Sequence, residues 1–248
     1  MPASKDFDIL EMPLDGLAAY WLSLRKLLDA KKGKGVIEEE LAATREPFIR
    51  FVLQTVFSDL ELGMVRTLLQ VRRQGLLADY RRKLDLVRVA FCGIAQAENP
   101  RVTLVRMDGL FAQAPLAENA IFDLAHGMIE GVAQKGADLP ALLGLDHTLK
   151  DDRLMVKLLF FAIVARREGK PSLAPFLKHS RFPYCSEGLS LVADGFDMAF
   201  IDAHLRGMRD RALSDLRRKL CMACELSLAV RARLPYEDVF RIARAWLP

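Results

Sequence analysis

Apolar residues recur at intervals of three and four along almost the whole chain. The stretches 17–28 and 64–77 both show this spacing, which places the apolar side chains on one face of an amphipathic helix. The best strand candidate, Arg101 to Val105, is short, and the equivalent stretch later in the chain is typical of a helix. Prolines fall between the periodic segments, where they can start or stop helices without breaking one. The pattern predicts an all-α protein.

The same pattern occurs twice. An offset of 136 residues aligns residues 78–84 with 214–220. Between positions 22 and 84, sixteen of 63 residues are identical at this offset without a gap, several times the roughly one in fifteen expected from average composition. After a one-residue slip, Pro100 aligns with Pro235. We therefore predict two tandem multi-helix units related by an internal duplication.

The duplication sets the expected domain boundaries. The parts are an N-terminal tail (1–15), a first helical repeat (16–112), a connecting helix and loop (113–150) and a second helical repeat (151–248). Each repeat should hold an apolar helix, a glycine break, a short helix, a proline-initiated helix, a long helix and a terminal helix. The main helices are expected at 17–31, 47–57 and 61–95, at 116–134 in the connector, and at 152–167, 183–193 and 197–232.

Large apolar side chains in these helices are expected to form the core. The residues in question are Trp21, Phe160, Phe161, Phe196 and Phe200. An apolar stripe that stays incompletely buried would become an oligomer or partner surface.

The second repeat carries a family resemblance. Ala165-Arg166-Arg167-Glu168-Gly169 is followed by Leu173, Pro183-Tyr184, Gly188-Leu189, Val192-Ala193-Asp194-Gly195 and Asp197, and then by a long charged helix. This order resembles the cytoplasmic segment of the flagellar stator subunit MotA. The first repeat resembles it more weakly, in Gly33, Ile37-Glu38, 46–50, Leu53-Gln54, Val56 and Glu61.

The resemblance implies a function in binding. In that family a cytoplasmic arginine and a glutamate contact the rotor. The arginine corresponds to Arg166 in the second repeat but to Ala30 in the first, and the glutamate to Glu38 in the first but to Ala174 in the second. The membrane helices of the family have no counterpart here, so the resemblance implies a cytoplasmic relative of a motor domain, peripheral at the flagellar base, that does not conduct ions.

Composition narrows the partner classes. The chain has 36 basic and 32 acidic residues, too small an excess to favour nucleic acid. The longest apolar run, 158–165, is far shorter than the roughly 20 residues that cross a bilayer. The N-terminus does not resemble a signal peptide, so we expect a cytoplasmic location and reduced cysteines.

Two basic triplets recur in register. They are Arg81-Arg82-Lys83 and Arg217-Arg218-Lys219. Neighbouring aspartates can pair with them at one helical turn, which favours a solvated helix face. The alternative is a docking surface for an acidic partner helix.

Two other motifs could carry chemistry. Cys221 and Cys224 form a CxxC motif inside the predicted long helix, where core or half-buried free thiols are favoured over a metal or redox site. Asp123, His126 and Glu130 share one helical face, which is either a solvated polar face or three ligands for a divalent metal. No nucleophile elbow and no glycine-rich phosphate loop are present, so we expect neither an enzyme nor a bound cofactor.

The sequence therefore predicts a protein–protein interaction module of the bacterial flagellar motor, acting as an adaptor, regulator or assembly factor. Its partner would be a stator or rotor component, and it could form homo-oligomers. The alternatives are a general helical scaffold or chaperone unrelated to motility, and a small metal-binding helical protein.

Overall fold

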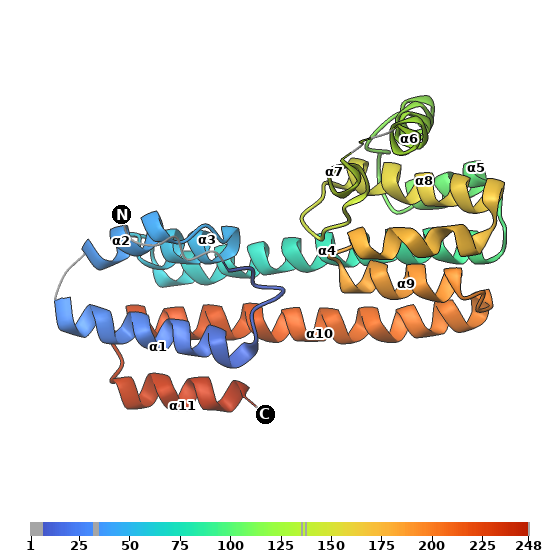
Figure 1. Ribbon diagram of the computed structural model, residues 1–248. Coiled ribbons are helices and arrows are strands. Elements are labelled where there is room, and N and C mark those ends of the chain that lie inside the picture. Colours follow the sequence, from blue (N-terminus) through green and yellow to red (C-terminus); the bar gives the residue numbers. More distant parts are fainter. Residues whose placement is uncertain (1–6, 32–34, 135, 137, 248) are drawn as a thin grey trace. The chain divides into compact units, whose positions relative to one another are not determined.

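The computed structural model describes residues 7–31, 35–134, 136 and 138–247. Apart from isolated bridge residues, among them Leu145 paired with Ser180, every regular element in these ranges is a helix (Figure 1). In chain order they are α1 (Leu14–Lys31), α2 (Gly35–Ala43), α3 (Pro47–Val56), α4 (Leu62–Ala95), α5 (Pro100–Asp108), α6 (Glu118–Ala133), α7 (Leu139–Leu143), α8 (Asp151–Glu168), the 3-10 helix η1 (Lys170–His179), α9 (Pro183–Ala193), α10 (Met198–Arg231) and α11 (Tyr236–Trp246). The predicted all-α class and the main helices are confirmed.

Local sequence explains where several helices begin. Glu46 caps α3 by accepting a hydrogen bond from the amide of Ile49 at 2.5 Å, and Asn99 caps α5 in the same way. Both helices then start with proline, whose missing N–H is not needed in the first turn. The strand candidate Arg101 to Val105 lies inside α5, so its helical interpretation is confirmed.

The helices form two compact units that divide the two longest helices. Unit 1 comprises the described residues up to Leu77 and from Leu213 onward, and unit 2 comprises Ala78–Ala212. Helices α4 and α10 have 34 residues each, about 51 Å at 1.5 Å per residue, and each contributes residues to both units. Each unit therefore combines parts of both predicted repeats, and its boundaries differ from 16–112 and 151–248.

Unit 1 has its core beneath α1. This helix packs against α2 and α11, and α2 packs against α3. Trp21 is fully buried, together with Phe48, Val52 and Leu53 from α3.

Unit 2 is organised around α8, which packs against α5, α6 and η1. Every residue from Leu154 to Val164 is buried, including Phe160 and Phe161. Despite this buried run, a helix both long and apolar enough to traverse a bilayer is not found in the described ranges.

The core prediction is confirmed for Trp21, Phe160 and Phe161 but wrong for Phe196 and Phe200. These two rings are 43% and 45% exposed. The buried stripe of α10 runs through Ile201 and Leu205, and each residue turns a helix by about 100°. Phe200 therefore points away from the stripe although it is adjacent to it in sequence.

Close packing in unit 2 depends on a glycine in α9. A Cβ at Gly188 would overlap Cδ2 of the buried Phe91 and lie 2.9 Å from its Cε2. We expect Gly188→Ala to lower the unfolding free energy by about 1–3 kcal/mol through overpacking, although alanine is the better helix former. At Gly127 in α6 a Cβ has no neighbour within 4 Å, so Gly127→Ala should instead stabilise. Urea unfolding of both variants checks this, and equal effects would contradict it.

Candidate functional site

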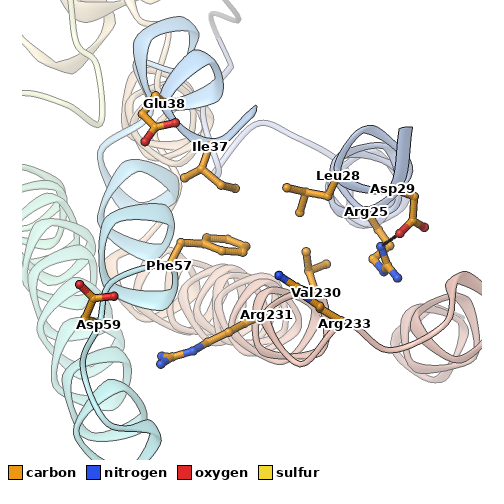
Figure 2. Close-up of a pocket in the computed structure, with 10 residues that line it drawn as sticks. All are labelled: Arg25, Leu28, Asp29, Ile37, Glu38, Phe57, Asp59, Val230, Arg231 and Arg233. Carbon is orange, nitrogen blue, oxygen red and sulfur yellow. Dashed lines mark hydrogen bonds and ion pairs between the residues drawn. The ribbon is translucent and has the colours of Figure 1, made fainter. Parts of the chain in front are cut away.

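A cavity with both apolar and charged walls lies in unit 1 (Figure 2). Its volume is about 990 Å³, and its walls come from α1, α2, the turn after α3 and the C-terminal end of α10. The lining residues are Arg25, Leu28, Asp29, Ile37, Glu38, Phe57, Asp59, Val230, Arg231 and Arg233. Four separate chain segments must therefore fold together before this site exists.

The centre of the cavity is apolar. Figure 2 shows the side chains of Leu28, Ile37, Phe57 and Val230 directed toward one another from these four segments. Val230 is buried, whereas the other three are half-buried. Partly exposed apolar side chains in a concave site are typical of surfaces that bind another molecule.

The end of α10 is held in place by an arginine from α1. The chain leaves α10 through Arg233, whose φ of 55° lies in the left-handed region. Arg25 is only 8% exposed, donates from Nε to the carbonyl oxygen of Leu234 at 2.7 Å and pairs with Asp29. A cation is favourable here because a helix C-terminus carries partial negative charge. Arg25 and Asp29 thus stabilise the wall of the cavity, and their charges neutralise each other.

The remaining charges divide the rim into an acidic and a basic part. Glu38 on α2 and Asp59 after α3 are exposed carboxylates. Arg231 and Arg233 come from the end of α10, and Arg231 is fixed by donating from Nη2 to the carbonyl oxygen of Leu60 at 2.6 Å. The rim is therefore dipolar, with no net charge.

A buried polar cluster lies where α1, α2 and the start of α3 meet. Burial raises the pKa of Glu46 to about 7, although the hydrogen bond from the Ile49 amide opposes this shift. Burial also raises the pKa of Tyr20 on α1, with a further contribution from Glu40 on α2. Glu40 accepts a hydrogen bond from Thr44 at 3.1 Å. This cluster stabilises the junction of α2 and α3.

The two residues implied by the family resemblance lie in different units. Glu38 lines the unit 1 cavity. Arg166 lies in the last turn of α8 in unit 2, where it donates to the carbonyl oxygen of Ala97 just after α4. Lys170 donates to the carbonyl oxygen of Ala95 at 2.5 Å, and together these residues line a second cavity of about 210 Å³. Arg166 is exposed beside the end of α4, and partner binding by this residue stays a prediction.

In the first basic triplet, only Arg81 is exposed. Arg82 pairs with Asp151 at 2.8 Å, and Lys83 donates to the carbonyl oxygen of His147 at 3.0 Å. Two of the three cations therefore hold the start of α8 and the segment before it.

The second triplet is similar, although Arg218 is exposed as well as Arg217. Arg217 is exposed, Arg218 donates to the carbonyl oxygen of Trp246 at 2.7 Å, and Lys219 is only 4% exposed and donates to that of Leu10 at 2.9 Å. Docking of an acidic helix at the triplets stays a prediction, and the side chains with most freedom to serve it are Arg81 and Arg217.

The thiols of the CxxC motif are free, as predicted. Cys224 is buried, which raises the pKa of its thiol to about 12. Cys221 is half-buried and accepts a hydrogen bond from Arg73 at 3.0 Å. Both lie in the middle of α10 rather than at its N-terminus, where a helix dipole would lower a thiol pKa.

The metal alternative finds no support in the structure. Asp123, His126 and Glu130 all lie on α6, yet neither they nor any other three His, Cys, Asp or Glu side chains in the described ranges are grouped to hold a metal ion. His126 instead packs near the ring of Phe122, with centroids 6.3 Å apart.

The sequence did not predict most of the residues that line the cavity. Leu28, Ile37, Phe57 and Val230 belong to four different segments, and nothing in their local pattern indicates a shared site. The resemblance implicated Glu38 alone. No protein-family model, curated protein or solved structure matches the chain.

Proposed function

We propose that the protein is a protein–protein interaction module, and that the unit 1 cavity receives an amphipathic helix of a partner. The observation that carries this proposal is the convergence of four apolar side chains in an open cavity of about 990 Å³. Helices dock into such grooves through apolar side chains spaced three and four residues apart. The volume accommodates several such side chains, and their burial supplies the binding energy.

The charges on the rim define the partner further. Glu38 and Asp59 favour a basic residue beside the partner's apolar stripe, and Arg231 and Arg233 favour an acidic residue on its other flank. A helix with basic residues on one flank and acidic residues on the other would pair with all four groups in one orientation only. The rim therefore contributes mainly to the specificity of docking.

We further propose that the chain arose by duplication. Helices α1 and α8 each have 18 residues, and α4 and α10 each have 34. Helices α5 and α11 begin at Pro100 and Tyr236, so the 136-residue offset continues past the slip in the sequence alignment. These correspondences support a common origin of the two repeats.

The ends of the two long helices support the duplication independently. Ala97 and Arg233 are 136 residues apart, and among described non-glycine residues they alone have positive φ, 54° and 55°. Each is followed by an amide that bonds back five residues, from Glu98 to Gly93 and from Leu234 to Ala229, as in a Schellman turn. Left-handed backbone costs an alanine or arginine about 1–2 kcal/mol, so its occurrence at the same place in both halves is informative.

The helix–helix contacts are related by the same offset. Arg73 contacts Cys221 at 3.0 Å in unit 1, and Arg209 contacts Asp85 at 2.8 Å in unit 2. Adding 136 to Arg73 and Asp85 gives Arg209 and Cys221. This reciprocity is expected of a duplicated pair of helices.

The resemblance to MotA identifies the partner class that we propose, a component of the bacterial flagellar motor contacted from the cytoplasm. Its support is the order of motifs in the second repeat and the position of Glu38 at the cavity. The protein would act as an adaptor, regulator or assembly factor of the motor.

Copurification tests two parts of this proposal: docking at the cavity, and a motor component as the partner. Ile37→Lys places a charge in the apolar centre of the cavity at a half-buried position, whereas Glu237→Lys changes an exposed residue of α11 outside the cavity. From detergent-solubilised cells, the wild type and Glu237→Lys are expected to retain motor components that Ile37→Lys loses. Circular dichroism of the purified variants controls for folding.

The outcomes distinguish docking at the cavity from the assignment of the partner to the motor. Loss of a defined set of non-motor proteins with Ile37→Lys alone would keep the interaction module and reject the motor assignment. Identical copurified proteins for the wild type and both variants would reject the cavity as the docking site.

A further inference from the structure

An exposed aromatic stack lies on α10 in unit 2, apart from the cavity described above. The rings of Phe196 and Phe200 have centroids 4.9 Å apart with an interplanar angle of 23°. His204 continues the stack at 5.9 Å and 19° from Phe200. Both phenylalanines are more than two-fifths exposed, so water contacts aromatic surface that folding has not buried.

Three carboxylates lie near this stack in the sequence or in the fold. Glu187 on α9 lies 3.1 Å from Nε2 of His204. Asp197, next to Phe196, accepts a hydrogen bond from the Phe200 amide at 2.9 Å, and Asp194 is exposed at the end of α9. The start of α10 and the end of α9 therefore provide an acidic border for the stack.

We propose that Phe196, Phe200 and His204, with Glu187, Asp194 and Asp197, form a docking surface for an arginine-bearing segment of a protein partner. A guanidinium group stacks on an aromatic face and forms paired hydrogen bonds with a carboxylate. The stack and its acidic border offer both at once. The same border disfavours acidic peptides and anionic lipid surfaces, because like charges repel.

The other half of the chain provides an internal comparison. At the 136-residue offset, Phe196 and Phe200 correspond to Leu60 and Met64, which are 41% and 52% exposed. Glu187 and Asp194 correspond to Phe51 and Ser58. The start of α4 is thus exposed and apolar but has neither the ring stack nor the full acidic border, so we expect it not to bind arginine.

Peptide binding by the full-length protein tests the proposal. The probe is a fluorescein-labelled peptide of four Gly-Arg repeats, with Gly-Lys and Gly-Glu peptides of equal length as comparisons. We expect the Gly-Arg peptide to bind most tightly, and the double variant Phe196→Leu/Phe200→Leu to weaken its binding about fivefold. The matched variant Leu60→Ala/Met64→Ala should leave it unchanged. Fluorescence anisotropy at a fixed salt concentration measures all affinities.

Several results would overturn the proposal. These are no binding of the Gly-Arg peptide, equal binding of the Gly-Glu peptide, or equal affinity of the wild type and the Phe196→Leu/Phe200→Leu variant. Binding to phosphatidylcholine vesicles that the double variant loses would assign the surface to lipid instead. Ile37→Lys should leave peptide affinity unaltered, so failure here is distinguishable from failure of the cavity proposal.

Discussion

Replacement of Lys157 by methionine is expected to lower the unfolding free energy by about 3 kcal/mol. Lys157 lies in the buried run of α8 and is only 8% exposed. Its ammonium group donates to the carbonyl oxygens of Leu142 at 2.6 Å and Gly144 at 2.8 Å, and that of Ala141 lies at 3.4 Å. These carbonyls end α7, where a positive charge is favourable.

Burial lowers the pKa of Lys157, and Arg153 adds to this shift. Methionine fills a similar volume but leaves the carbonyl oxygens of α7 without their donor, and unsatisfied buried polar groups are costly. Lys150→Met, at an exposed position just before α8, is the matched control and should change stability little. Urea unfolding followed by circular dichroism measures both. A loss below 1 kcal/mol for Lys157→Met would contradict this role.

Glu46→Gln is expected to change the pH dependence of unit 1. The pKa of Glu46 is raised to about 7 in the folded protein from its ordinary value of 4.5, chiefly by burial. Between these values the unfolded chain releases a proton that the folded chain retains. The stability contributed by this group is therefore fully present below pH 4.5 and lost as the pH rises to 7, by about 1.4 kcal/mol per unit.

Glutamine remains able to accept the hydrogen bond from Ile49 but does not ionise. Relative to the wild type, Glu46→Gln should therefore be more stable at pH 8 than at pH 5 by roughly 3 kcal/mol. Trp21 and Trp246 both belong to unit 1, so urea unfolding followed by tryptophan fluorescence monitors the affected unit. A difference between wild type and variant that does not vary with pH would contradict the raised pKa.

Sequence reasoning succeeded where local signals decide the structure. The helices that begin at Pro47, Pro100 and Pro183 could be placed because proline and an apolar period act over a few residues. The middle position of Cys221 and Cys224 in a long helix followed from the same period.

The sequence did not predict features that depend on contacts between distant segments of the chain. The exposure of Phe196 and Phe200 depends on which face of α10 packs, and the partners of Lys83 and Lys219 are carbonyl oxygens 64 and 209 residues away in sequence. The cavity likewise needs Ile37 and Val230 from opposite ends of the chain. Hydrophobic periodicity contains no information about such pairings.

The most direct test of the interaction proposal is site-specific photocrosslinking from the cavity in living cells. A photoreactive amino acid at Ile37 points toward the cavity centre (Figure 2), and the same amino acid at Glu237 on α11 serves as the control. We expect a discrete crosslinked protein from position 37 that is absent from position 237 and whose attached peptide is an amphipathic helix with basic and acidic flanks. Crosslinking of the same proteins from both positions, or none from position 37, would contradict the assignment of this cavity as a docking site.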